Sequence, residues 1–496
     1  MNRTLPLALL ALAACGPNQL PDGSYYDGTG SLWQADNLTP AGDDLYAPLG
    51  SGALMVLHAD GSFDDVELSG GKVRSLQPLP DGSGVAAFVD TERCVRDGRD
   101  DCASVEISSR LALIEDGEVG TVAAIASHYD TLAFAPGGRS AVAWLAGDVP
   151  DGPLGVVNLG EVDVIDLDSG ERTPVRVGFD ADQILFTDDG SEAVVLSQSQ
   201  VAVVDLTASP PAPRVTFPLT LDPDVVVRPV GVDLTPDGRY ALIATSTSGD
   251  LYVLDLVDPS VNIVSLPSPP SAMYVSESTD ETLLVFAGRA ELAVIDHDNF
   301  DVRYLPLDES MSRILPGNGD LVLANVGNRQ DVYRYDLAEG KLTEYRLQSR
   351  PTQVELSPDG DWAVAFTQGT NGRPGMELLD LRGERASIAT YALDGAGVGL
   401  AFTTDAQGAT WAMVLQDGVD SLWKGELASG RAEVVPLELP PLSLGAFGDG
   451  RFFIAQDDDF GLVSFYDPAT NGVIDASGFA LFGVLDDEEP LPALEN

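Results

Sequence analysis

Lysine, histidine and cysteine are scarce in this chain: each occurs three times among 496 residues. The histidines, His58, His128 and His297, are widely spaced, so they offer no local cluster for a metal or a general base. The motifs HExxH, CxxC, GxSxG, a Walker loop and a helix-opening GxGxxG are also missing. The sequence therefore predicts no catalytic residue, no metal ligand set and no bound cofactor.

Positive charge is the second deficit, with 27 Lys and Arg against 78 Asp and Glu and a formal net charge of −51. A field of this sign repels nucleic-acid phosphates and anionic membrane surfaces, which excludes nucleic acid as a general partner. Solubility or adaptation to salt is the favoured reason for the charge. Binding of cations or of a basic partner is the alternative.

One stretch, GVDLTPDGRYALIATSTSGDLYVLDL (231–256), defines a unit that recurs from about residue 73 to the end. Alternating apolar residues approach and leave the turn Pro236-Asp237-Gly238, which predicts a β-hairpin. Proline presets φ, aspartate bonds the backbone ahead of it, and glycine accepts the positive φ that ends the turn. Two further apolar runs, at 251–256 and 261–266, complete four antiparallel strands, the content of a β-propeller blade.

Nine equivalent turns follow one another at 80–82, 136–138, 188–190, 236–238, 278–280, 316–318, 358–360, 404–406 and 448–450. A half unit at 53–68 precedes them and is expected to complete the last blade. We therefore predict an all-β fold: a single β-propeller of eight or nine four-stranded antiparallel blades, rather than seven, at 51–483. An acidic tail, 484–496, follows it.

The third strand of most units ends in an acidic residue: Asp166, Asp205, Asp255, Asp296, Asp336, Asp380, Glu426 and Asp467. A carboxylate at this place can accept hydrogen bonds from the backbone of the following turn. We therefore interpret these residues as structural and not as a catalytic or metal-binding set.

The segments LSPDGDWAVAF (356–366), LTPDGRYALIA (234–244) and VDVIDLDSGE (162–171) resemble repeats of the YVTN/WD40-like β-propeller superfamily. The resemblance extends over nearly all of the chain beyond its N-terminal region. It implies the fold more than the function, because this superfamily includes adaptors, surface proteins, lactonases and quinoprotein dehydrogenases.

Residues 1–14 contain Arg3 and a leucine-rich run that is too short to span a bilayer, and Cys15 follows them directly. The tetrapeptide Leu12-Ala13-Ala14-Cys15 resembles the lipobox of bacterial lipoproteins, which implies a signal peptide at 1–14 and a lipid such as palmitate on Cys15. Gly16, in place of an aspartate, implies the outer membrane, facing the periplasm or the cell surface. An ordinary secretory leader is the alternative.

Residues 15–50 are rich in Gly, Pro and Asp and are predicted to be a flexible tether, although their aromatic residues favour partial packing on the folded body. Cys94 and Cys102 are predicted to form a disulfide that closes a small surface loop, since an exported chain lives in an oxidising compartment. Calcium stays open as an alternative to a cofactor-free protein, with the acidic segments 97–101 and 457–459 as its candidate ligands.

In a propeller, the loops that join second to third strands and successive blades lie on one face. These loops are the long and irregular ones here, at 89–109, 146–160, 245–250, 287–290, 326–331, 367–375 and 415–420. They carry the candidate ligand-binding residues Arg289, Arg329 and Arg373, with Arg350 nearby. Guanidinium groups bind carboxylates and phosphates. Pairing of each arginine with a neighbouring acid is the favoured alternative.

The sequence thus favours a monomeric, non-catalytic lipoprotein, held at the envelope by its lipid and serving as a binding or scaffolding module for a protein partner. A lactonase-like or quinoprotein-like enzyme acting on a small anionic substrate is one alternative. A propeller subunit of an outer-membrane assembly complex is another, and it rests on analogy alone.

Replacement of Cys15 by serine is expected to remove the lipid and to release the chain from the membrane fraction of its host, because lipid attachment requires the thiol. Incorporation of labelled palmitate, followed by fractionation of the envelope, checks this. Membrane retention of the unlabelled Cys15→Ser chain would contradict a lipid anchor.

Overall fold

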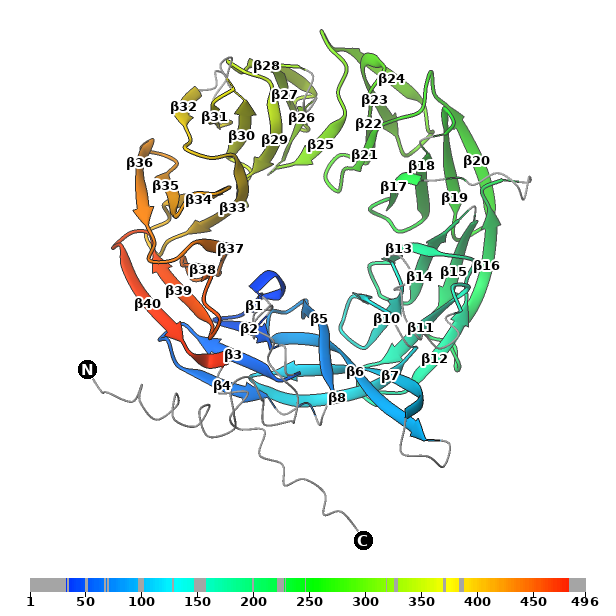
Figure 1. Cartoon of the computed structure of the whole chain (residues 1–496). Helices are drawn as coiled ribbons and strands as arrows, with labels where there is room; N and C mark the ends of the chain where they lie inside the picture. The colour runs from blue at the N-terminus through cyan, green and yellow to red at the C-terminus, as the bar shows by residue number, and fades with distance from the viewer. Residues whose placement is uncertain are drawn as a thin grey trace. The chain divides into compact units, whose positions relative to one another are not determined.

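The structure is a computed structural model that describes residues 33, 35–49, 52–66, 68, 71–96, 102–126, 129–146, 158–198, 200–220, 227, 229–245, 247–317, 319–324, 329–368, 372–382 and 388–480. Within these residues the strands form ten four-stranded antiparallel sheets, which we number as blades 1 to 10 in chain order. In every blade the strands are adjacent in sequence order, so each blade is a meander (Figure 1). The fold is an all-β propeller of four-stranded antiparallel blades, as predicted. Among the described residues, no helix is long and apolar enough to cross a membrane.

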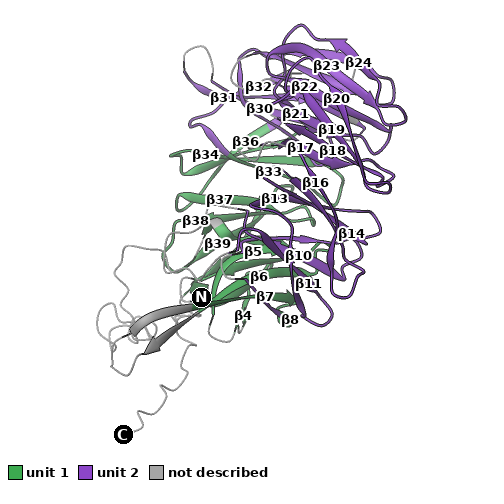
Figure 2. Ribbon diagram, turned by 90° about the vertical axis from the view of Figure 1, so that its right-hand side faces the viewer, with its two compact units in different colours: residues 1–122, 399–428, 432–496 green, residues 123–398, 429–431 purple. Residues whose placement is uncertain are grey.

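The blades fall into two compact units, which Figure 2 distinguishes by colour. Unit 1 contains blades 1, 2, 9 and 10 except for short pieces of β8, β33 and β36, and unit 2 contains these pieces and blades 3 to 8. The elements of unit 1 are η1 (Ala35–Asn37), β1 (Thr39–Ala41), β2 (Asp44–Pro48), β3 (Leu54–His58), β4 (Phe63–Val66), β5 (Lys72–Pro78), β6 (Gly84–Arg96), β7 (Cys102–Glu115), β8 (Glu118–Ile125), β33 (Gly397–Thr404), β34 (Thr410–Gln416), β35 (Ser421–Glu426), β36 (Arg431–Pro436), β37 (Pro441–Ala446), β38 (Phe452–Gln456), β39 (Leu462–Asp467) and β40 (Gly472–Ser477).

The elements of unit 2 are β9 (Thr131–Phe134), β10 (Ser140–Trp144), β11 (Glu161–Asp166), β12 (Arg172–Arg176), β13 (Ala181–Phe186), β14 (Glu192–Ser197), β15 (Gln200–Asp205), β16 (Ala212–Pro218), β17 (Pro229–Leu234), β18 (Tyr240–Thr245), β19 (Asp250–Asp255), β20 (Ser260–Ser265), β21 (Ala272–Val275), β22 (Glu281–Phe286), β23 (Arg289–Asp296), β24 (Val302–Pro306), β25 (Arg313–Pro316), β26 (Asp320–Ala324), β27 (Asp331–Asp336), β28 (Lys341–Arg346), β29 (Pro351–Leu356), β30 (Trp362–Gln368), β31 (Pro374–Asp380) and β32 (Ile388–Ala392).

Each of the nine predicted turns joins the first and second strands of a blade, from blade 2 to blade 10. In blade 5 the turn forms as its residue types require. Asp237 accepts hydrogen bonds from the backbone N–H of Arg239 at 3.0 Å and from the hydroxyl of Thr235 at 2.6 Å. Gly238 has a φ of +66°, a conformation that residues with a side chain rarely adopt. The turn sequence therefore fixes the hairpin locally.

The second and third strands of a blade are buried on both faces. In β14, Ala193 and Val195 join the apolar cluster shared with blade 3. Val194 and Leu196, which alternate with them, join the cluster shared with blade 5. Successive side chains of a strand point to opposite faces, so a central strand such as β14 packs against two neighbouring blades of its unit. This double burial explains the continuous apolar runs of the sequence.

The number of blades was predicted wrongly: ten are present among the described residues, and not eight or nine. The half unit at 53–68 supplies β3 and β4 of a complete blade, whose first two strands come from Thr39–Ala41 and Asp44–Pro48. Those strands lie inside the stretch predicted to be a tether, so the folded part begins before residue 51. Gly42, at a φ of +58°, allows the tight turn between them, and Leu45, Tyr46 and Ala47 are buried.

The half unit does not complete the last blade either, since blade 10 has four strands of its own. Instead the whole of blade 1 packs against blade 10 within unit 1. One cluster joins buried residues of both blades, among them Leu45, Met55, Phe453 and Phe465. The two ends of the described chain are thus brought together by side-chain packing between complete sheets.

Two residues outside the strands close this contact. Trp33, before blade 1, donates from Nε1 to the carbonyl of Asp458 at 2.8 Å. Phe479, after blade 10, is fully buried and meets the Trp33 ring edge-on, at 5.1 Å between ring centroids and 86° between planes. Phe63 of β4 lies 6.3 Å from the same phenyl ring. We call Trp33, Phe63 and Phe479 the terminal latch.

Replacement of Phe479 by alanine is expected to lower the free energy of unfolding by roughly 3–5 kcal/mol, the usual cost of emptying a buried phenylalanine site. Phe460→Ala is the matched control, because that ring is 45% exposed. Urea unfolding followed by circular dichroism compares the two variants. Equal losses in both would show that the latch does not stabilise unit 1.

Candidate functional site

Each blade has two chemically different ends, because consecutive antiparallel strands place their connections alternately. The hairpin end carries the turns between strands one and two and between strands three and four. The loop-rich end carries the connection between strands two and three and the link to the next blade. We use these two terms for each blade separately.

At the hairpin ends, the turn aspartates are committed to the backbone. Each accepts a hydrogen bond from the N–H two residues ahead, at 2.9–3.1 Å: Asp81, Asp189, Asp237, Asp359, Asp405 and Asp449. The carboxylates that end the third strands each accept a hydrogen bond from a backbone N–H of the following turn, two or three residues ahead, at 2.8–3.1 Å: Asp166, Asp205, Asp255, Asp296, Asp336, Asp380 and Asp467. The predicted structural role of these seven is confirmed.

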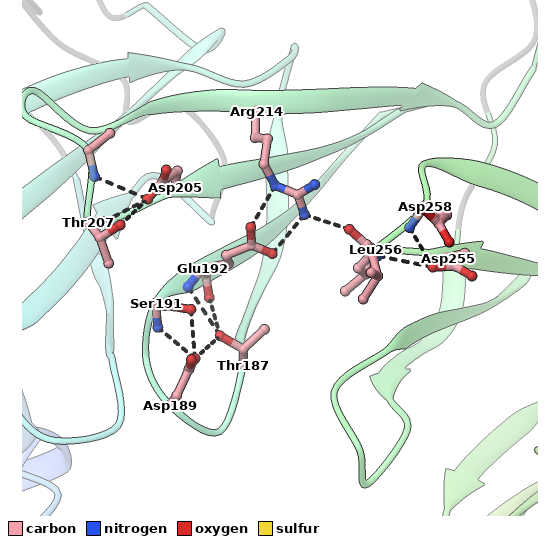
Figure 3. Close-up of polar contacts among 12 residues, drawn as sticks. Thr187, Asp189, Ser191, Glu192, Asp205, Thr207, Arg214, Asp255, Leu256 and Asp258 are labelled. Atoms are coloured by element: carbon pink, nitrogen blue, oxygen red, sulfur yellow. Dashed lines mark hydrogen bonds and ion pairs between the residues drawn. The ribbon is translucent and has the colours of Figure 1, made fainter.

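Figure 3 shows how densely the hairpin ends of blades 4 and 5 are bonded. Arg214 binds Glu192 with two hydrogen bonds, Nε to Oε1 at 2.6 Å and Nη2 to Oε2 at 2.9 Å. Its Nη2 also donates to the carbonyl of Leu256, in the next blade, at 2.6 Å. The guanidinium therefore ties two blades together, and the polar groups at this end serve the fold.

The four candidate arginines lie at loop-rich ends in unit 2, as the sequence predicts, but two of them are paired with acids. Arg289 contacts Glu291 at 3.1 Å, and Arg329 contacts Glu309 at 3.0 Å. Arg350 and Arg373 are exposed and make no ion pair with the described residues. Among the described residues no hydrogen bond or ion pair joins one of these arginines to another, and binding of an anion by them stays a prediction.

Two of the three histidines are described, and both are structural. His58 bridges Asp44 and Asp64 across neighbouring strands of blade 1, at 2.7 Å and 3.0 Å. These carboxylates raise the pKa of His58 against the lowering effect of burial. His297 is buried and shares a 2.8 Å hydrogen bond with the hydroxyl of Thr282, and burial lowers its pKa. His128 lies outside the described residues.

The cysteine and calcium hypotheses stay predictions. Cys15 lies outside the described residues. Cys94 and Cys102 lie on the paired strands β6 and β7, but their side chains are not described. The segment 97–101 is not described either. Asp458 of the second acidic segment accepts a backbone hydrogen bond from Phe460 at 2.8 Å. Within the described part of the chain no group of three His, Cys, Asp or Glu residues is arranged to hold a metal ion.

Sequence reasoning missed three charged residues that are almost fully buried in third strands. Asp163 accepts from the backbone N–H of Ala126 at 2.7 Å and contacts Arg172 at 2.8 Å. Glu377 accepts from the backbone N–H groups of Gln348 and Ser349, at 2.8 Å and 3.0 Å. Both carboxylates thus hold the link that leads into their own blade. The available signal was a charge interrupting an apolar run, as in VDVID and MELLD.

Lys424 is the third buried charge and one of only three lysines. Its ammonium donates to the carbonyl of Pro468 at 2.9 Å and to the hydroxyl of Tyr466 at 3.1 Å, both from blade 10. It also contacts Glu433 at 2.5 Å, and the Trp411 ring lies 5.1 Å away. All of its donors are occupied, so the lysine joins blades 9 and 10 and is not a reactive amine.

A cleft of about 630 Å³ lies at the loop-rich ends of blades 3 and 4, within unit 2. Its lining includes Arg176, Phe179 and Gln200, with the backbone of Gly160 and Gly178. Phe179 is 58% exposed, which is unusual for an aromatic side chain. No pattern in the sequence indicates this cleft, since an exposed phenylalanine in a link looks like a core residue. Arg176 on its wall makes no ion pair with the described residues, whereas Arg214, beside a second cleft, is paired with Glu192.

Comparisons with known proteins reach the fold only. No protein-family model and no curated protein matches the chain. Among solved structures, the dihydro-heme d1 dehydrogenase NirN in complex with DHE is similar at a TM-score of 0.40 and 15% identity, over 64% of this chain and 72% of that one. A eukaryotic initiation factor is similar at a TM-score of 0.38 and 13% identity, over 70% of this chain and 96% of that one.

The hydrazine synthase of Kuenenia stuttgartiensis is similar at a TM-score of 0.34 and 17% identity, over 59% of this chain and 94% of that one. Enzymes and a protein of another kind therefore stand among these neighbours. Similarity of this degree carries no argument about activity.

The two described histidines are expected to affect stability with opposite pH dependence. The pKa of His58 is higher in the folded state than the unfolded value near 6.5. The charged imidazole therefore contributes its full stabilisation of the fold below about pH 6.5, and this contribution is lost as pH rises through the folded pKa. For His297 the folded pKa is lower, so folding is favoured when the ring is neutral, and stability is lost as pH falls below about 6.5.

Accordingly, His58→Gln is expected to be more destabilising at pH 5.5 than at pH 8, by up to about 1 kcal/mol for a partly exposed pair. His297→Gln is expected to show the reverse trend. Urea unfolding of the three proteins at both pH values measures the differences. A His58→Gln effect that is independent of pH would contradict the ion pairs with Asp44 and Asp64.

Proposed function

We propose that this chain is a non-catalytic binding module of the cell envelope, anchored through a lipid on Cys15, which recognises its partner with the loop-rich ends of its blades. The observation that carries the proposal is the contrast between the two ends of the blades. The hairpin ends are short, repetitive and internally bonded, as the turn aspartates show. The loop-rich ends differ from blade to blade, which is typical of binding surfaces on a regular scaffold.

Blade 2 gives the largest departure from the repeat. Its first strand pairs with β6 as far as Asp90, but the ladder between β6 and β7 continues to Arg96 and Cys102. The two strands therefore extend beyond the rest of their sheet, at the loop-rich end. An extended two-stranded ribbon offers paired backbone beyond the end of β5, and this supports a role in contacting a partner.

The position of Trp33 also supports the proposal. Trp33 pairs with Leu49, directly after β2, and bonds Asp458 in the connection between β38 and β39. Both of these contacts lie at loop-rich ends. The N-terminal segment that leads to Cys15 therefore joins the folded body on the side of blades 1 and 10 that we assign to recognition.

Photo-crosslinking in the host envelope tests the proposal with a matched pair of exposed valines. Val398 lies at the loop-rich end of blade 9 and is 59% exposed, whereas Val257 lies at the hairpin end of blade 5 and is 67% exposed. With a photoreactive residue at each position in the full chain, we expect one discrete protein adduct from Val398 and none from Val257. The adduct is read by gel shift and mass spectrometry.

An adduct from Val257 alone, or from neither position, would overturn recognition by the loop-rich ends. A reaction product formed from a small substrate by the purified chain would overturn the non-catalytic assignment.

A further inference from the structure

The cleft at the loop-rich ends of blades 3 and 4 combines an aromatic ring and a guanidinium that the fold itself does not use. Arg176 is the last residue of β12 and is exposed. Glu161 stands opposite it in the ladder between β11 and β12, yet Arg176 makes no ion pair with any described residue. In a chain with 78 acidic and 27 basic residues, most described arginines contact a carboxylate, as Arg172, Arg214 and Arg239 do. An unengaged guanidinium on a cleft wall is therefore an available anion-binding group.

The link from β12 to β13 holds Phe179 outward by unusual backbone geometry. Gly178 precedes it at a φ of +144° and Asp180 follows it at +61°. A Cβ on Gly178 would lie 2.1 Å from Nε2 of Gln200, so another residue there would displace that side chain as well as take an unfavourable φ. Glycine adopts a positive φ without steric cost, and aspartate tolerates the left-handed region better than most residues, so these two residue types suit the path of the link.

Hydrogen bonds impose that geometry. The carbonyl of Phe179 accepts from the backbone N–H of Gln198 at 3.0 Å, and the N–H of Asp180 donates to the carbonyl of Leu159 at 2.8 Å. The carboxylate of Asp180 accepts from Nε2 of Gln198 at 2.8 Å. The link is therefore rigid, although its central ring is 58% exposed and gains little from burial. A solvent-exposed aromatic ring on a link that hydrogen bonds hold in place is available to bind an apolar group.

The amide groups of the cleft add directional polar contacts. Gln200 donates from Nε2 to the carbonyl of Val177 at 2.7 Å, which fixes the amide plane on the cleft wall. Asn158, which also lines the cleft, accepts from the N–H of Gly160 at 3.1 Å through Oδ1, so its NH₂ group remains available as a donor. The lining thus presents two donor groups, Arg176 and Asn158, beside an apolar ring.

We propose that this cleft binds a carboxylate that carries a ring-sized apolar group, with the carboxylate on Arg176 and the apolar group on Phe179. The inference rests on the proposed function, since it assigns a ligand chemistry to one of the loop-rich ends. A volume of about 630 Å³ matches the range of small-ligand sites. The same chemistry is found in a free aromatic acid and in the C-terminal residue of a partner peptide.

The negative charge of the protein does not prevent such binding. Charges beyond about 8 Å are largely screened at physiological salt. Among the described residues that line the cleft, Arg176 is the charged one, and Glu161 and Asp180 are outside that lining. Local charge therefore favours a single carboxylate over a cationic group.

Titration of the full chain with N-acetylphenylalanine, followed by ligand-observed NMR, tests the proposal. We expect a dissociation constant on the order of 1 mM, as the size of the probe permits. N-acetylphenylalanine amide, which lacks the charge, and acetate, which lacks the ring, are each expected to bind at least tenfold more weakly. Arg176→Gln and Phe179→Ser are each expected to weaken binding of the acid at least tenfold.

Arg350→Gln is the matched control, because Arg350 is also an exposed arginine at a loop-rich end of unit 2, and it is expected to leave binding unchanged. Circular dichroism of each variant confirms that it is folded. No saturable binding at 10 mM, equal binding of the amide, or an Arg176→Gln variant that binds like wild type would each overturn the proposal.

A tetrapeptide ending in phenylalanine distinguishes the two sources of the ligand. Binding of the peptide with a free C-terminus, but not of its C-terminal amide, would assign the cleft to a partner's chain end. Binding of the free acid alone would assign it to a small molecule. The Val398 crosslink is independent of this cleft: with the crosslink and no probe binding, only the cleft assignment fails, and with probe binding and no crosslink, only partner recognition fails.

Discussion

The double apolar face of each blade is the constraint on which the rest of the structure depends. A central strand such as β14 sends alternate side chains into two different clusters, so a blade with a neighbour on one side only would leave an apolar face in water. The first and last blades of a chain face this problem most directly. Unit 1 solves it by packing blade 1 against blade 10, with the terminal latch covering the contact.

The same constraint determines how charge is used. Of the carboxylates that sequence patterns mark, those in turns and at strand ends bond to nearby backbone N–H groups, and the buried Asp163 and Glu377 hold the links into their blades. Lys424 connects blades 9 and 10 through its contacts with Glu433 and with the carbonyl of Pro468. Many charged groups in this protein therefore stabilise its fold, whereas Arg176 makes no ion pair with the described residues and lines a cleft.

The repeated parts of the fold were predictable from the sequence, because local turn chemistry determines them. Proline, aspartate and glycine fix each hairpin wherever they occur in that order, as at Pro236-Asp237-Gly238. Blade 1 was not predictable, since β1 is three residues long and β2 ends in a proline, which gives no strand pattern. The arginine positions were predicted at the right ends of the blades, but their pairing with Glu291 and Glu309 depends on tertiary geometry. The cleft beside Phe179 depends on backbone conformations that a single sequence does not reveal.

The packing of blade 1 against blade 10 also has a kinetic consequence. Leu45 and Phe465 share one cluster, although about four hundred residues separate them along the chain. During synthesis, blade 1 emerges from the ribosome first. One of its apolar faces stays uncovered until blade 10 has been synthesised and packs against it. Contacts of such long sequence separation form slowly, because a large loop must close before they are gained. Unit 2 is instead nearly continuous in sequence, so its blades can fold in order while the first blade stays exposed to aggregation.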